Sequence, residues 1–186
     1  TKPVKKFEMQ AHGGYSSGKA LLPSLRIGSK MDHFYIQGTL SHQKQEGYPL
    51  SARFDTTGIL GTEDGGMRDN AFRNDLRGNL KIGYTPNKTD TYSLNYTYHD
   101  AEKGNPSYAG TDPLQRERFW QWPEWKKQSL YFISQTRTGD HARARFRAFY
   151  NTYFNRLKSY DDASYTLQTR RYAFTSNHDD HSLGAN

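Results

Sequence analysis

Cysteine is absent from this chain of 186 residues, which excludes disulfide frameworks and zinc sites built on thiolates. Long apolar runs are also missing, because no stretch approaches the roughly 20 consecutive apolar residues that a membrane-spanning helix needs. The opening stretch TKPVKKFEMQ lacks the apolar core of a signal peptide. Only 33% of the residues are hydrophobic and the mean hydropathy is -1.03, so the chain offers little material for a compact soluble core.

Aromatic residues, in contrast, are plentiful. The chain carries 14 Tyr, 10 Phe and 3 Trp, whereas disordered chains of similar polarity are depleted in aromatics. A scaffold with a polar interior and an aromatic exterior would accommodate both properties. The net charge is +7, but acidic residues are interspersed among the basic ones, and we do not expect nucleic acid as a partner.

The stretch HARARFRAFYNTYF, residues 141–154, alternates with a period of two. In a strand this period places Arg143, Arg145 and Arg147 on one face, and Ala144 and Phe146 on the other. Such a strand suits the wet face of a soluble sheet, a nucleic-acid groove or the watery inside of a membrane barrel. An arginine on the lipid side near the midplane would cost about 2 to 4 kcal/mol, so in a barrel the arginines face the lumen.

Similar alternation divides the chain into strands of about 9 to 11 residues, the length with which a tilted strand crosses a bilayer. We predict strands at residues 7–15, 23–30, 34–43, 75–84, 91–100, 126–137 and 141–154, with an eighth beginning at HSLGAN. An open sheet would leave unpaired edges in lipid. We therefore expect an all-β fold, in which residues 1–186 form the first seven to eight antiparallel strands of a larger transmembrane β-barrel.

The connections between these strands alternate in length, apart from a short first hairpin around SSGKALL. Tight turns are predicted at residues 29–32, 85–90 and 137–140, and long loops at 44–74, 101–125 and 155–181. Short turns on one rim and long loops on the other are typical of outer-membrane barrels. A soluble up-and-down barrel could also alternate, but such long loops are uncommon in a compact domain.

Aromatic side chains flank the predicted turn at 85–90. Tyr84 and Tyr92 share one face with alternating apolar residues, and Phe34 follows the preceding turn. We predict that Phe34, Tyr84 and Tyr92 form an aromatic girdle at the membrane boundary. The alternative is that they are ordinary strand formers on a solvated sheet face.

Several stretches resemble the TonB-dependent outer-membrane receptors. TKPVKKFEMQAHGGYSS is similar to that family's crossing from plug to barrel, GSKMDHFYIQGTLSHQKQEGY to its second strand, turn and third strand, and RFWQWPEWKKQSLYF to a loop leading into a strand. The resemblance implies a barrel of about 22 strands around a plug, in the bacterial outer membrane. It also implies import of scarce nutrients with energy from the TonB complex through the plug. The plug and TonB box have no counterpart in this sequence.

The resemblance also gives a direction, with short turns periplasmic and long loops extracellular. Arg143, Arg145 and Arg147 then lie low in the lumen and pair with plug carboxylates, or else line a hydrated wall. Ligand contacts are expected from upper inward positions and loops. These are His99, Tyr108, Arg116, Arg118, Trp120, Trp122, Tyr153 and Asn155. The alternative is that the tryptophans form an outer girdle and the arginines pair with lipopolysaccharide phosphates.

Other clusters have weaker chemical interpretations. SNHDDHS at 176–182 is interpreted as a solvated turn without a metal, and GTEDGGMRD at 61–69 as a Gly-rich loop tip. No nucleophile has a visible base, so we expect neither an enzyme nor a cofactor. The predicted function is import of a small nutrient, foremost a ferric siderophore, across a membrane of lipid and lipopolysaccharide. The alternatives are a passive porin, a small structural barrel and an outer-membrane hydrolase.

Overall fold

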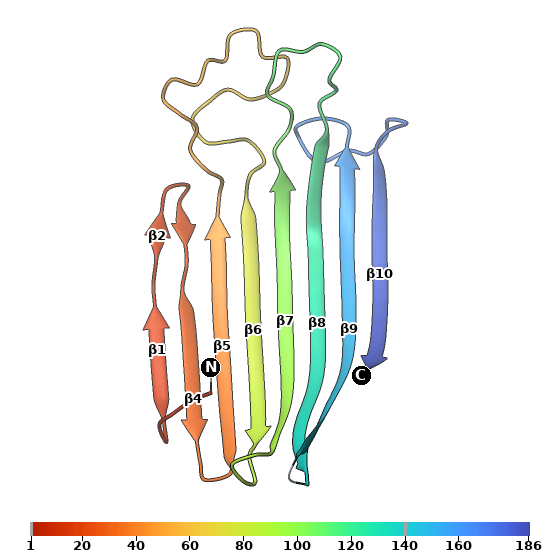
Figure 1. The fold of residues 1–186 in the computed structure, drawn as a ribbon. Helices are drawn as coiled ribbons and strands as arrows, with labels where there is room; N and C mark the ends of the chain where they lie inside the picture. The colour runs from red at the N-terminus through yellow and green to blue at the C-terminus, as the bar shows by residue number, and fades with distance from the viewer. Residues whose placement is uncertain (1, 140) are drawn as a thin grey trace.

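The computed structural model describes residues 2–139 and 141–186, and they form one antiparallel β-sheet of ten strands (Figure 1). The all-β prediction is therefore confirmed. Within the described residues, no helix is long and apolar enough to cross a membrane.

The strands follow one another across the sheet in nearly the order of the chain, β1-β4-β5-β6-β7-β8-β9-β10. A short hairpin of β2 and β3 extends the first strand pair, as expected around SSGKALL. The strands are β1 (Glu8–His12), β2 (Tyr15–Ser16), β3 (Ala20–Leu21), β4 (Ser24–Lys30), β5 (Phe34–Gln45), β6 (Arg73–Tyr84), β7 (Thr91–Asn105), β8 (Phe119–Thr138), β9 (Ala142–Tyr160) and β10 (Phe174–Ala185).

Short and long connections lie at opposite ends of the sheet (Figure 1). The connections at residues 31–33 and 85–90 and the described ends of β8 and β9 gather at one end, and the loops at 46–72, 106–118 and 161–173 at the other. The predicted alternation is confirmed for the described residues. Position 140 of the predicted turn at 137–140 lies outside them, as does Thr1 of the stretch matched to the plug crossing.

Several strands extend further than their sequence pattern predicts. β8 begins at Phe119 and β9 ends at Tyr160, so the predicted loops at 101–125 and 155–181 were too long. A bulge between Gln121 and Glu124 shifts the register of β8. Because a bulge inserts one extra residue into a strand, the period of two is broken at this point. Pro123 lies in this bulge, where a strand tolerates proline.

The residues 176–182, predicted as a solvated turn, lie inside β10 and pair with β9 along their whole length. The eighth strand was predicted to start at HSLGAN, and the earlier part of β10 was missed because polar residues occupy both of its faces there. His178 and Asp180 share one face, while Asp179 and His181 share the other and form an ion pair of 3.3 Å. The four side chains therefore do not converge.

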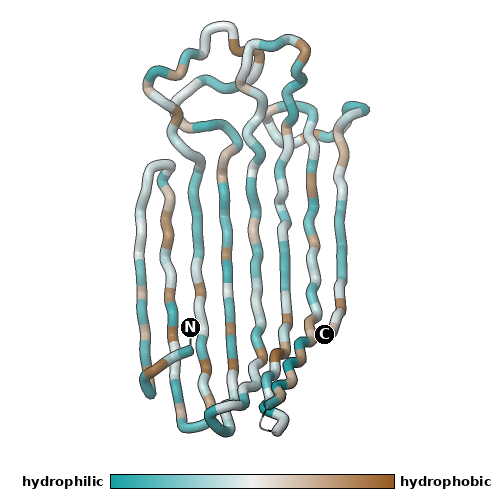
Figure 2. Tube along the Cα trace, viewed as in Figure 1, coloured by the Kyte–Doolittle hydropathy of each residue, from teal (hydrophilic) through white to brown (hydrophobic). Residues whose placement is uncertain are grey.

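The two faces of the sheet differ in composition. On one, called the outer face, apolar and aromatic side chains stand next to one another in register across the strands. Two such rows are Ile36-Ile82-Leu94-Phe132-Ala148 and Gly38-Leu80-Tyr96-Leu130-Tyr150-Leu183. On the opposite, inner face the adjacent row is Gln37-Lys81-Asn95-Tyr131-Phe149. In Figure 2 hydrophobic and hydrophilic positions alternate along the strands accordingly.

Most of the large outer-face side chains are exposed, among them Leu80 at 43%, Ile82 at 45% and Leu94 at 44%. Side by side in register across β5 to β9, these side chains form a continuous exposed apolar surface. β1 and β10 form the two edges and do not pair with each other, so the sheet is not closed. The predicted number of strands in a complete barrel is therefore not tested by this sheet.

Aromatic rings mark the edge of the apolar surface near the short turns. Phe34 stacks on Tyr84 with 4.6 Å between ring centroids, and Tyr84 on Tyr92 with 6.2 Å. These three rings share the outer face, as the girdle prediction requires. At the opposite edge, Tyr96 donates its hydroxyl to Gln128, and Tyr98 donates to Asp100. Aromatic rings therefore border the apolar surface at both of its ends.

Residues 2–7 cross the inner face before the chain turns into β1 (Figure 1). Pro3 is fully buried, and a side chain at Gly28 would collide with it. The Lys2 ammonium lies 5.4 Å from the ring centroid of Tyr35, which is an inner-face residue. The chain thus joins the sheet from its polar side.

Candidate functional site

A ladder of aromatic rings lines the inner face at the end of the long loops. The β8 bulge brings Trp120, Trp122 and Trp125 to the same face, although an unbroken period of two would separate them. Adjacent centroids lie 6.5 Å and 6.2 Å apart, and Trp125 contacts Tyr153 of β9 at 5.6 Å. All three contacts are edge-to-face, an arrangement that aromatic quadrupoles favour.

Cations lie against these rings. The Lys103 ammonium of β7 lies 3.9 Å from the centroid of Trp125 and 4.8 Å from that of Trp122, and the Arg118 guanidinium lies 4.9 Å from Trp120. A cation over an indole ring is attracted by the negative ring face. The ladder therefore combines broad aromatic surface with positive charge.

A buried carboxylate organises the cations beside the ladder. The Asp75 side chain is 1% exposed and accepts hydrogen bonds from Arg73 and from Arg77. His99 Nε2 lies 3.0 Å from the same carboxylate. A buried charge must be paired, and the two guanidinium groups together outweigh the single negative charge. With Lys103 opposite Arg73 in the register, this part of the inner face is net positive.

The upper end of the ladder opens into a cavity of about 660 Å³. Its wall consists of Arg116, Glu117, Arg118, Phe119, Trp120, Ser159, Tyr160, Tyr172 and Phe174. Phe174 packs edge-to-face on Trp120 at 6.3 Å. Two arginines and several aromatic rings around one cavity suit a planar, anionic ligand of modest size.

Two of the long loops are fastened to each other beside this cavity. The Arg68 guanidinium donates to Glu63 of its own loop and to the Ser107 carbonyl oxygen of the next loop. The side-chain amide of Asn70 donates to the carbonyl oxygens of Asn105 and Trp120, at 2.7 Å and 2.8 Å. The loops therefore position the start of β8, where the ladder begins.

Burial and charge shift the titration of the loop groups. Burial alone would raise the pKa of Glu63, but the hydrogen bonds from Arg68 and from the backbone N–H groups of Asp69 and Gly65 hold that pKa below its usual value. Burial, followed by the charges of Glu63 and Asp64, raises the pKa of Asp69. Burial raises the pKa of Tyr165 to about 12. Glu63 is buried, whereas Asp69 and Tyr165 are half-buried.

The predicted ligand residues are partly brought together. Arg116, Arg118 and Trp120 line the cavity, Trp122 and Tyr153 belong to the ladder, and His99 belongs to the Asp75 cluster. Asn155 is buried and donates to the Tyr153 hydroxyl at 2.9 Å. Tyr108 is the exception, because its hydroxyl accepts a hydrogen bond from the Asp112 backbone within the loop and it does not line the cavity.

Sequence reasoning placed Trp120 and Trp122 in a loop, but both lie in β8. It also missed Trp125, Lys103 and Asp75 as parts of the same surface. Lys103 was assigned to a loop by the polar stretch after residue 100, and the strand register that places it over the indoles was not visible in the sequence.

The three arginines of β9 lie on the inner face near the short turns, as predicted for Arg143, Arg145 and Arg147. All three are exposed. Among residues 2–139 and 141–186, no acidic side chain forms an ion pair with any of them. They offer positive charge to another molecule or domain.

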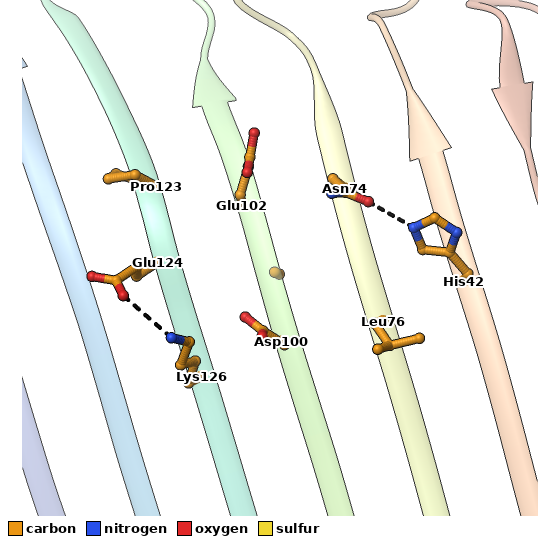
Figure 3. A pocket seen from close by; sticks show the side chains of 9 residues that line it. His42, Asn74, Leu76, Asp100, Glu102, Pro123, Glu124 and Lys126 are labelled. Atoms are coloured by element: carbon orange, nitrogen blue, oxygen red, sulfur yellow. Dashed lines mark hydrogen bonds and ion pairs between the residues drawn. The ribbon is translucent and has the colours of Figure 1, made fainter.

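A second cavity, of about 610 Å³, lies on the opposite face (Figure 3). It is lined by His42, Asn74, Leu76, Asp100, Ala101, Glu102, Pro123, Glu124 and Lys126. Lys126 donates to Glu124 at 3.2 Å, and His42 is hydrogen-bonded to Asn74 at 2.6 Å.

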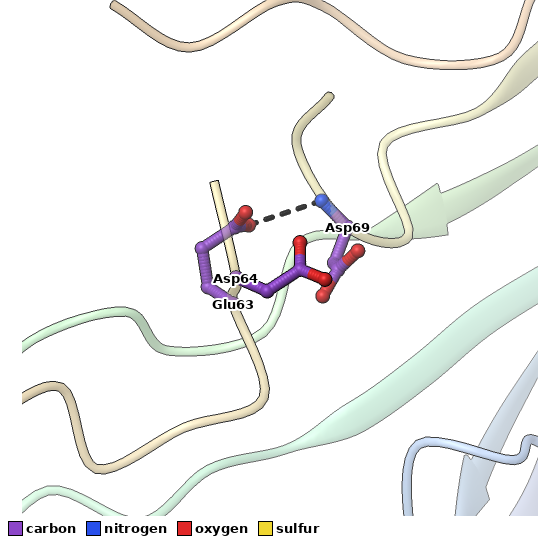
Figure 4. A group of neighbouring side chains, drawn as sticks. All are labelled: Glu63, Asp64 and Asp69. Atoms are coloured by element: carbon purple, nitrogen blue, oxygen red, sulfur yellow. Dashed lines mark hydrogen bonds between the residues drawn. The ribbon is translucent and has the colours of Figure 1, made fainter. Parts of the chain in front are cut away.

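Three carboxylates approach one another in the first long loop, those of Glu63, Asp64 and Asp69 (Figure 4). One oxygen of each lies within 4.8 Å of the others. Glu63, however, is 4% exposed and pairs with Arg68, so its charge is already balanced within the protein. Both Glu63 and Arg68 lie in the Gly-rich stretch at 61–69, so their ion pair holds this stretch together.

Comparison with known protein families, with curated proteins and with solved structures finds no match to this chain.

Proposed function

We propose that this chain is part of a transmembrane β-barrel of the bacterial outer membrane, in a TonB-dependent receptor that imports a ferric siderophore or another small anionic nutrient. The contrast between the two faces of the sheet carries this proposal. An exposed apolar face with polar side chains behind it is stable only where lipid covers the apolar side.

The dimensions of the apolar surface support a membrane setting. Its rows run from the level of Phe34 to that of Leu40 in β5, which is about 20 Å at a rise of about 3.3 Å per residue. Once a tilt of about 40° is allowed for, this is a height of about 15 Å, which the side chains of the bordering rows extend toward the apolar band of about 25 Å that such barrels carry. Tyrosines and Phe34 lie at its two boundaries.

The path of residues 2–7 favours a receptor over an open pore. Because Pro3 is buried against the inner face, the chain approaches β1 from what would be the barrel interior. A plug held inside the barrel would connect by this route. Arg143, Arg145 and Arg147 would then meet carboxylates of that plug, since guanidinium groups pair with carboxylates in bidentate geometry.

The ligand class follows from the cavity and the ladder. Arg116 and Arg118 supply positive charge at the cavity, and the tryptophans supply flat surfaces for stacking. A ferric chelate with planar arms and net negative charge has both properties. Transport itself would draw on the TonB complex through the plug, with no cofactor and no catalytic step.

Uptake of iron chelates by whole cells that express the complete receptor tests this function. We expect Arg116→Ala combined with Arg118→Ala to weaken chelate binding by about tenfold, with a larger deficit at low salt, because exposed charges are screened over about 8 Å at physiological ionic strength. Lys88→Ala removes one positive charge from a short turn on the other rim and should not change binding. Dissipating the inner-membrane energy should stop import but leave surface binding intact.

If a neutral ligand binds tightly and the double substitution changes the binding of no iron chelate, the siderophore is not the ligand. The proposal that the chain belongs to an import receptor would then still stand. Import that continues without energy would favour a passive pore.

A further inference from the structure

The cavity of about 660 Å³ has a carboxylate in its wall beside the two guanidinium groups. Glu117 stands in the chain between Arg116 and Arg118, and all three residues line the cavity. Arg118 lies over the indole ring of Trp120, whereas Glu117 is held by the first long loop. The cavity therefore carries charges of both signs.

Hydrogen bonds fix the Glu117 side chain in place. Thr62 donates both its backbone N–H and its hydroxyl to Glu117 Oε1, each at 3.1 Å. A Cβ at the neighbouring Gly61 would collide with the carbonyl oxygen of Tyr108 and lie 2.9 Å from the same Oε1, so glycine permits this close approach. The other oxygen, Oε2, accepts no hydrogen bond from the described residues. Glu117 is thus positioned through Oε1, while Oε2 keeps its capacity for a further donor.

The charges in the cavity wall do not neutralise one another. Within the part of the chain that the structure describes, none of Arg116, Glu117 and Arg118 forms an ion pair. When a ligand fills the cavity and displaces water, each of these groups needs a partner of opposite charge. A purely anionic ligand would pair with the arginines but leave the carboxylate facing negative charge, which costs affinity.

More negative charge lies close to Glu117 in the first long loop. Burial is the main cause of the raised pKa of Asp69, and the charges of neighbouring carboxylates add to it, that of Glu117 among them. Burial, followed by the charge of Glu117, raises the pKa of Tyr165 to about 12. The Arg68 guanidinium in this loop is already paired with Glu63. The surroundings of Glu117 therefore favour a positive group of the ligand at this side of the cavity.

We infer that Glu117 selects a nutrient that carries a protonated amine beside its planar, anionic groups. The ammonium group would donate to Glu117 Oε2, while Arg116 and Arg118 would pair with anionic oxygens of the ligand. A purely cationic ligand would be repelled by the two guanidinium groups. The inference rests on the proposed function, and it narrows the ligand of that site to a chelate with charges of both signs.

The test compares two chelates that differ in one charge, a ferric tris-catecholate with one free lysine amine and the same chelate with that amine acetylated. Titrated into the purified complete receptor, the amine form should bind about tenfold more tightly than the acetylated form. Glu117→Gln should remove this preference, because glutamine still accepts hydrogen bonds from Thr62 but carries no charge. Arg116→Ala should instead weaken the binding of both chelates alike.

Glu102→Gln is the matched control, because it removes the same charge from the opposite face of the sheet and should leave the preference for the amine form unchanged. Heat-modified gel mobility verifies that each variant is a folded barrel.

Equal affinity of the wild type for the two chelates would overturn the inference and leave the anionic nutrient of the proposed function in place. So would a preference for the amine form that survives in Glu117→Gln, because the carboxylate would then not be its origin. A wild-type receptor that binds neither chelate would contradict the anionic chelate of the proposed function as well.

Discussion

The outer and inner faces of the sheet are built from the same strands, yet neighbouring residues meet opposite surroundings. Leu94 stands between Ile82 and Phe132 on the outer face, whereas Asn95 stands between Lys81 and Tyr131 on the inner face. Side chains alternate across a strand, so a shift of one residue in register would exchange the two surfaces entirely. The comparison teaches that the period of two, rather than overall hydrophobicity, defines the environment of this chain.

The largest expected effect separates the two faces directly. Leu94→Arg should destabilise the complete barrel by about 2 to 4 kcal/mol, because it places a charge on the lipid side near the midplane. Asn95→Arg adds the same side chain to the inner face and should be tolerated. Reversible unfolding of the barrel from lipid vesicles in denaturant measures both. Equal costs at the two positions would mean that the faces do not differ in environment.

Glycines sharpen the comparison through packing. On the inner face the Tyr35 ring lies over Gly83 of the neighbouring strand, and a Cβ there would overlap it, so Gly83→Val should cost about 1 to 3 kcal/mol. On the outer face the nearest atom to a Cβ at Gly78 is Leu40 Cδ1, at 3.8 Å. Gly78→Val should therefore be close to neutral. The same unfolding experiment measures both losses of stability. A larger loss for Gly78→Val than for Gly83→Val would show that the Tyr35 ring does not fill the space over Gly83.

A smaller effect concerns ligand binding. Trp125→Ala removes the ring that covers the Lys103 ammonium at 3.9 Å, and binding of an anionic chelate should weaken by about tenfold. Phe132→Ala removes a ring of the same β8 strand from the outer face and should leave binding unchanged. Titration of the purified receptor measures both affinities. Equal losses would locate the ligand away from the inner ladder.

The smallest expected effect is a pH dependence of the loops. The hydrogen bond from Arg68 lowers the pKa of Glu63. The ion pair between the two residues therefore stabilises the loop fully above the unfolded pKa of Glu63, about 4.5, and this stabilisation is lost as the pH falls through the lowered pKa. The raised pKa of Asp69 acts in the opposite sense, because its ionised form destabilises the loop above that pKa. Once the intrinsic pH dependence of amide exchange is divided out, the protection of the Asp69 backbone N–H, which donates to Glu63 at 3.0 Å, should fall in acid, and Glu63→Gln should abolish this dependence. A protection factor of the wild type that stays the same from pH 7 to pH 3 would exclude this role of Glu63.

The regular part of the fold could be predicted because it is encoded locally. Alternation marked the strands near residues 34–43, 75–84 and 91–100, and a tight turn with Asn87 and Asp90 separated the last two. The shared face of Phe34, Tyr84 and Tyr92 follows from the same count of residues. These features need no knowledge of distant contacts.

The candidate site could be predicted only in part, because the bulge in β8 decides it. The bulge between Gln121 and Glu124 is what places Trp120, Trp122 and Trp125 on one face. In the sequence, the only sign of this bulge is a proline at position 123. The Asp75 cluster depends on pairing between β6 and β7 beyond the apolar rows, where alternation of polarity fades. The first part of β10 was missed for the same reason, since residues 176–182 are polar on both faces.

The central claim is that the outer face contacts lipid while the inner face contacts water, and cysteine chemistry tests it most directly because the chain has no cysteine of its own. Leu94→Cys and Asn95→Cys in the complete protein, reconstituted in bilayers, would each carry a spin label. The account predicts that the label at residue 94 collides mainly with oxygen dissolved in lipid, and the label at residue 95 mainly with a water-soluble nickel chelate. Equal accessibility to the nickel chelate at both positions would contradict it.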